Sequence, residues 1–76
     1  MTEQEFRRAV HDYNATTLTE AKTDAWAYKV QGIDVVIVDF GSLGYGLMLR
    51  RAAAAMMLPT IDPPTSEEVK AAGGVK

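Results

Sequence analysis

The chain has 76 residues, a net charge of −2 at pH 7, 47% hydrophobic residues and no Cys. This length predicts a single domain with a small core, and without Cys it has no disulfide or thiolate zinc site to stabilise that core. The acidic balance argues against the broad basic surface on which non-specific nucleic-acid binding depends. We expect no metal and no cofactor, and we expect association with itself or with a protein partner to supply the missing stability.

The first residues predict an N-terminal helix from Glu3 to Tyr13. Thr2 and Glu5 have the spacing of a capping box, in which each side chain hydrogen-bonds the backbone N–H of the other residue. Apolar residues then recur at helical spacing and form one stripe, which consists of Phe6, Ala9, Val10 and Tyr13. The same segment lacks the apolar core of a signal peptide, so the sequence predicts a cytoplasmic protein, of a bacterial cell or of an infected host.

Residues 17–31 fit either a strand or a helix. The stretch "WAYKV" alternates, and "IDVVIVDF" is rich in β-branched residues, as strands are. With a hairpin turn at Gln31-Gly32, Lys29 would face Asp34, and "TTLT" could add a third strand to make a meander. The alternative is a helix that begins near Thr17 and ends at Gly32. We favour the hairpin, because a helix here would leave the following strand without a partner for its backbone.

The stretch "GSLGYG" leads into a predicted long apolar helix from Leu43 to Leu58, with Ser42 as its N-cap and Pro59 just beyond its end. Its glycines match neither the dinucleotide fingerprint nor the phosphate loop, so we interpret them as a bend. The helix is apolar on nearly all sides except at Arg50 and Arg51. Such a helix is either buried or packed on a second body.

The C-terminal segment contains Pro59, Pro63 and Pro64, which force an extended or turned path. Thr65 and Glu68 form another possible capping box for a short helix to Ala72, closed by Gly73-Gly74. We therefore predict a small α+β domain in the order α-β-β(-β)-α. Residues 1–60 would form its compact part, and residues 61–76 a Pro-led tail with a possible short helix.

No pair of residues predicts catalysis. Ser42 lacks the G-x-S-x-G context of a hydrolase nucleophile. His11 and Asp12 are adjacent on a helix and do not face each other, and Asp34 and Asp39 would project to opposite faces of a regular strand. We expect that the protein is not an enzyme.

Residue types that are enriched in interfaces give the best indication of function. They predict a non-enzymatic protein-binding module, of the kind found among bacterial and phage accessory proteins, that acts as an inhibitor or an assembly component and forms a homodimer or a stable complex. The alternative is a nucleic-acid or anion binder that uses the Arg doublets and the amides of "GSLGYG". The candidate contact residues are Trp26, Tyr28, Tyr45, Leu49, Arg50, Arg51 and Met56.

Overall fold

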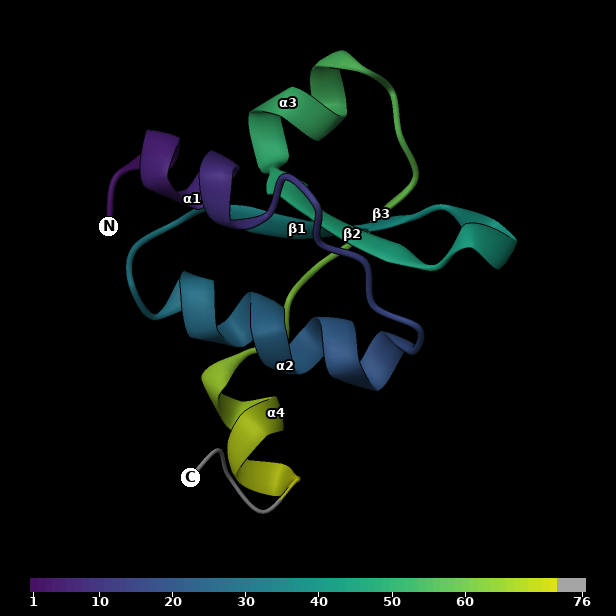
Figure 1. Cartoon of the computed structure of the whole chain (residues 1–76). Helices are drawn as coiled ribbons and strands as arrows, with labels where there is room; N and C mark the ends of the chain where they lie inside the picture. The colour runs from purple at the N-terminus through teal and green to yellow at the C-terminus, as the bar shows by residue number, and fades with distance from the viewer. Residues whose placement is uncertain (73–76) are drawn as a thin grey trace.

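A three-stranded antiparallel sheet in the order β2–β1–β3 lies at the centre of the fold (Figure 1). The computed structural model describes residues 1–72. It confirms a small α+β domain that begins with a helix. The elements are α1 (Glu3–Ala9), α2 (Leu18–Lys29), β1 (Val35–Asp39), a 3₁₀ turn (Gly41–Leu43), β2 (Tyr45–Leu49), α3 (Arg50–Ala55), β3 (Thr60–Ile61) and α4 (Ser66–Ala71).

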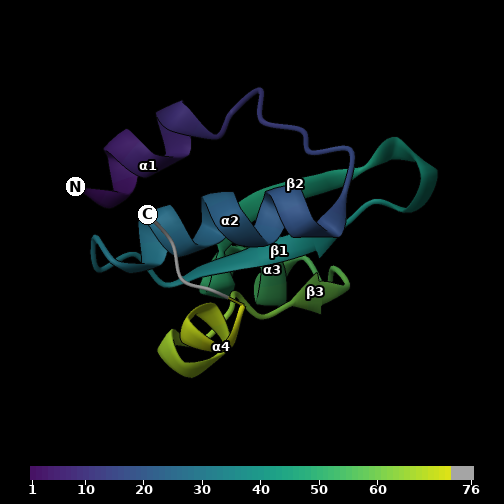
Figure 2. The ribbon, with the colours of Figure 1, turned by 90° about the horizontal axis from the view of Figure 1, so that it is seen from below.

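The helices cover the two faces of the sheet unequally. In Figures 1 and 2, α2 lies along one face and α3 on the other, with α1 beside the β2 edge. On the α2 side, the buried cluster consists of Phe6, Ala15, Ala21, Ala25, Ile33, Val35, Ile37, Leu47 and Leu49. On the α3 side, only Val36, Val38 and Ala53 are fully buried, with Met48 and Leu58 packed against them. The second layer of the core is therefore thin.

The predicted hairpin of "WAYKV" and "IDVVIVDF" with its turn at Gln31-Gly32 is wrong, because residues 18–29 form α2. The side chain of Thr17 accepts a hydrogen bond from the N–H of Glu20 at 3.2 Å, which starts the helix, and Ala21 and Ala25 are buried against the sheet. Just beyond the end of α2 lies Gly32, at a φ of 89° that suits glycine. Lys29 consequently does not face Asp34.

The backbone partner of β1 lies downstream, in β2. Val36 pairs with Met48 and Val38 with Gly46, in an antiparallel register. The turn between the strands uses Gly41 and Gly44 at positive φ angles of 67° and 102°. A helical α2 therefore does not leave β1 unpaired, because the segment "YGLML" supplies the partner strand.

The predicted helix from Leu43 to Leu58 is also wrong in its first half. Residues 45–49 are extended, and only residues 50–55 are helical. At Gly46 an added Cβ would lie 2.7 Å from Cε2 of Phe40, so glycine makes room for that ring to lie against the strand. Ser42 belongs to the 3₁₀ turn and is not an N-cap, and α3 begins after Leu49 without a side-chain cap.

Both terminal capping boxes are confirmed. Thr2 and Glu5 exchange hydrogen bonds of 2.9 and 3.1 Å at the start of α1, which ends at Ala9 rather than at Tyr13. Thr65 and Glu68 do the same at the start of α4, with both distances at 3.2 Å. The predicted closure of this helix at Gly73-Gly74 lies outside the described residues. Upstream of α4, Ile61 pairs with Ile37 in the sheet and Pro63 is buried.

Candidate protein-binding cleft

A cleft of about 310 Å³ opens between α1 and α3 over strand β2. Its volume is at the lower end of the range of ligand pockets, roughly 300–1,000 Å³. Its floor is apolar, and its charged or polar lining side chains come only from α1 and the turn after it. The lining residues are Phe6, Arg7, Val10, His11, Leu47, Met48, Leu49, Ala52 and Met56.

The floor of the cleft is the outer edge of the sheet. At one end of this edge, Ala15 and Tyr45 exchange backbone hydrogen bonds of 2.8 and 2.9 Å. Every second residue of a strand directs its N–H and C=O to the same side, so Leu47 and Leu49 point their N–H groups the same way as Tyr45. Within residues 1–72, these two N–H groups have no hydrogen-bond acceptor. The edge is therefore closed at Tyr45 and open from Leu47 to Leu49.

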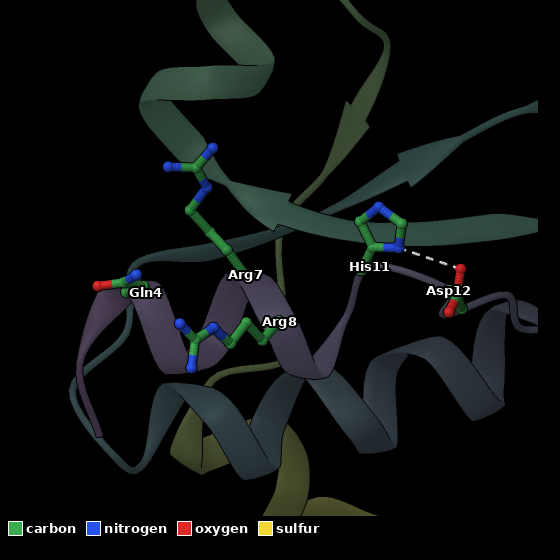
Figure 3. A pocket seen from close by; sticks show the side chains of 5 residues that line it. All are labelled: Gln4, Arg7, Arg8, His11 and Asp12. Atoms are coloured by element: carbon green, nitrogen blue, oxygen red, sulfur yellow. Dashed lines mark hydrogen bonds and ion pairs between the residues drawn. The ribbon is translucent and has the colours of Figure 1, made fainter.

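The α1 wall of the cleft is basic. Figure 3 shows Arg7 rising toward α3 and His11 beside the strand. Neither Arg7 nor Arg8 forms an ion pair with a carboxylate of residues 1–72, whereas Nδ1 of His11 lies 3.1 Å from a carboxylate oxygen of Asp12. A shallow hollow of about 530 Å³ on the outer side of α1 shares Arg7 and His11 with the cleft. Unneutralised positive charge thus lies along this rim.

The opposite rim, formed by α3 and the residues after it, carries two exposed methionines. Met56 is 62% exposed and Met57 is 90% exposed. Met57 has a φ of 54°, and its N–H donates to the carbonyl of Ala54 while the N–H of Leu58 donates to that of Ala53. These two bonds define a Schellman motif, whose left-handed position is usually glycine. A large apolar side chain at this position adds no burial to the fold and raises its backbone energy.

The second Arg doublet of the sequence, Arg50 and Arg51, is by contrast paired inside the molecule. Arg50 donates to Asp34 at 3.0 Å and to Asp62 at 2.9 Å, so it joins α3 to the start of β1 and the end of β3. These hydrogen bonds raise the pKa of the Arg50 guanidinium. The bond to Asp62 contributes most and the bond to Asp34 comes next. Arg51 donates to Glu3 at 3.0 Å and joins α3 to α1.

The aromatic candidates lie away from the cleft or inside the core. Trp26 lines a hollow between α2 and α4, and Nζ of Lys29 lies 5.7 Å from the centroid of its ring. Tyr28 packs edge-to-face on Phe6, with their ring centroids 5.0 Å apart. Tyr45 is partly buried against the larger cluster. Trp26 and Tyr28 lie on α2 and Val30 is its C-cap, so these residues do not form one face of a strand.

The structure therefore brings only Leu49 and Met56, of the seven candidates, into the cleft. Sequence reasoning missed Arg7, His11 and the open edge of β2. It considered Arg7 only as part of an Arg doublet for the nucleic-acid alternative, and it treated residues 45–49 as part of a helix. The glycine pattern around Phe40 is the one signal that could have indicated a strand there.

The part of the chain that the structure describes contains no group of three or more His, Asp or Glu residues arranged to hold a metal ion. None of its helices has the length and apolar character needed to cross a membrane. Comparison with known protein families, curated proteins and solved structures found no match.

Proposed function

We propose that this chain is a non-enzymatic, cytoplasmic protein-binding module that receives a protein partner in the cleft between α1 and α3. The observation that carries the proposal is the exposed Met56 on the rim of an apolar cleft, followed in the chain by the still more exposed Met57. Methionine is enriched at protein interfaces because its flexible, polarisable side chain adapts to irregular surfaces. Such a module would act as an inhibitor or an assembly component of a larger complex.

Two further observations support a protein partner. Met57 holds a left-handed backbone conformation in which glycine has a lower conformational energy. Its side chain therefore lowers the stability of the free chain. A partner that buries this side chain would offset that cost. In addition, Arg50 and Arg51 are paired with carboxylates, so the nucleic-acid alternative keeps only one of its two doublets, Arg7 and Arg8.

The test compares two single substitutions to glutamate at exposed apolar residues. Met56→Glu places a charge on the cleft rim, where a partner would bury it at high cost. Leu43→Glu is the matched control, because Leu43 is 76% exposed on the turn between β1 and β2 and does not line the cleft. Both variants and the parent chain are used as bait in lysate of the source organism, and captured proteins are quantified by mass spectrometry.

We expect a specific protein that the parent chain and Leu43→Glu retain and that Met56→Glu loses by at least about tenfold, which corresponds to about 1.4 kcal/mol. Nuclease treatment should leave its capture unchanged, and moderate salt should weaken it only slightly. Equal loss in both variants, or retention that disappears with nuclease or steeply with salt, would contradict the proposal.

A further inference from the structure

The open backbone edge inside the cleft indicates the form in which a partner binds. Resting on the proposed function, we infer that the cleft takes an extended, acidic segment of the partner, which adds a strand to the β2 edge at Leu47 and Leu49. Binding of this kind takes its affinity from main-chain hydrogen bonds and its specificity from pockets for alternate side chains. The inference rests on the backbone, on the surrounding side chains and on charge.

The backbone of β2 has a short edge that can pair with an added strand. The N–H groups of Leu47 and Leu49 point away from β1 and have no acceptor within residues 1–72. Unpaired strand edges readily pair with another chain, and soluble proteins normally cover them or protect them with charge. The chain itself already uses this edge once, because Ala15 pairs with Tyr45 as an isolated bridge. A partner strand would continue in line with that bridge.

The cleft provides room and apolar contacts on both sides of the edge. Alternate side chains of an added strand point to opposite faces of the sheet. On the face shared with α1 they would meet Phe6 and Val10, and on the face shared with α3 they would meet Met48. Because both faces are apolar, the predicted ligand carries apolar groups at consecutive positions along its extended part, as valine and threonine do with their methyl groups.

Charge selects an acidic partner rather than a second copy of this chain. Arg7, which lines the cleft, and Arg8, which lines only the hollow on the outer side of α1, have no carboxylate partner within residues 1–72. Two copies joined edge to edge by a two-fold axis between their β2 strands would place both α1 helices on the same face of the joined sheet. Their arginines would then approach each other, whereas acidic side chains that flank an added strand would pair with them.

The experiment titrates isotope-labelled protein with synthetic peptides and follows the backbone amides by NMR. The probe is a peptide of about six alternating valine and threonine residues with glutamate at both ends. One matched peptide carries lysine in place of glutamate. A second matched peptide keeps the glutamates but is N-methylated at every other residue, which removes one hydrogen-bonding edge.

We expect the acidic peptide to shift the amide signals of Leu47 and Leu49 and to slow their hydrogen exchange by at least about tenfold. The lysine peptide should bind several-fold more weakly, and the N-methylated peptide should give no protection. Arg7→Gln should weaken the acidic peptide several-fold, whereas Lys22→Gln should leave it unchanged, because Lys22 lines the hollow between α2 and α4.

Unprotected Leu47 and Leu49 amides at about 1 mM acidic peptide, a concentration that detects even weak complexes, would overturn the inference. So would a free protein that is already dimeric with these amides protected, since a second copy would then occupy the edge. The two proposals fail separately. If a lysate partner depends on Met56 while both amides remain unprotected, the protein-binding function stands and strand addition does not.

Discussion

Met57 is the residue whose conformation departs most from what its side chain favours. It takes the left-handed position of the Schellman motif after α3, with a φ of 54° and 90% of its surface exposed. Met57→Gly should therefore raise the free energy of unfolding by about 1 kcal/mol, since glycine adopts this conformation without a Cβ clash. Urea denaturation checks the change.

Met56→Gly is the matched control, because Met56 has a right-handed conformation with φ −90° and gains nothing from glycine. It should lower the free energy of unfolding by several tenths of a kcal/mol, or about 1 kcal/mol at most. Equal effects of the two substitutions would show that the backbone of Met57 is not strained.

Tyr13 gives the chain a dependence on alkaline pH. Burial, and then the hydrogen bond from its hydroxyl to the carboxylate of Asp24, raise the pKa of Tyr13 above its ordinary value. The folded state thus holds this proton more tightly than the unfolded state. The resulting stabilisation is complete below the unfolded pKa of about 10 and is lost as pH rises above it.

Replacing Tyr13 by Phe should lower the free energy of unfolding by about 1 kcal/mol at neutral pH, the usual contribution of one hydrogen bond. It should also make the fall in stability above about pH 10 shallower. Urea titrations at neutral and alkaline pH measure both effects. Tyr45→Phe is the control, because its hydroxyl has no hydrogen bond to other residues of the described chain. A fall above pH 10 that is as steep in Tyr13→Phe as in the parent chain would contradict the assignment.

At the scale of elements, α4 depends on the side chain of Trp26. The helix has no fully buried residue, and Trp26 and Val69 lie in the same hollow between α2 and α4. A six-residue helix does not persist alone in water. Trp26→Ala should therefore release α4, so that the amides of residues 69–71 exchange at nearly unfolded rates while those of β1 stay protected.

Hydrogen exchange measured by NMR distinguishes this outcome from general destabilisation. Val30→Ala is the control, because Val30 is 62% exposed at the end of the same helix and does not line the hollow. Loss of protection in β1 to the same extent as in α4 would show instead that Trp26 supports the whole fold.

Elements with strong local signals could be predicted from the sequence. The capping boxes at Thr2 and Thr65 depend on residues three positions apart, and the β-branched run of β1 has no competing helical pattern. Strand β2 could not be recognised, because "YGLML" lacks β-branched residues and runs into α3 without a cap. Because residues 45–49 were predicted to be helical, β1 had no partner downstream. The segment "WAYKV" of α2 was therefore wrongly predicted to be the partner strand.

The cleft could not be predicted for a further reason. Its walls come from residues 6–11 and residues 52–56, and its floor comes from residues 47–49. Only the position of α1 beside the β2 edge brings these segments together. Sequence identified Leu49 and Met56 from their apolar character alone, whereas it could not tell which Arg doublet lacks carboxylate partners, and the structure shows that Arg7 has none within residues 1–72.

At the scale of the whole molecule, we expect the free chain to have a small free energy of unfolding. Its core has a well-filled layer on the α2 side of the sheet and a thin layer on the α3 side. A chain of 76 residues without disulfides buries a smaller share of its surface than a larger domain does. A ligand that binds only the folded state would therefore contribute a large fraction of the total stability.

The melting temperature should accordingly rise with the acidic strand-forming peptide. At a free concentration roughly a hundredfold above its Kd, the peptide adds about 2.7 kcal/mol, which corresponds to roughly 10–20 °C for a domain of this size. The lysine peptide should give a much smaller rise at the same concentration. Calorimetry with and without peptide makes the measurement.

The homodimer expected from the sequence stays a prediction, and melting the free chain over a roughly hundredfold range of concentration tests it by the same mass action. A midpoint that rises with protein concentration alone, and not with the acidic peptide, would identify a second copy of the chain as the stabilising partner.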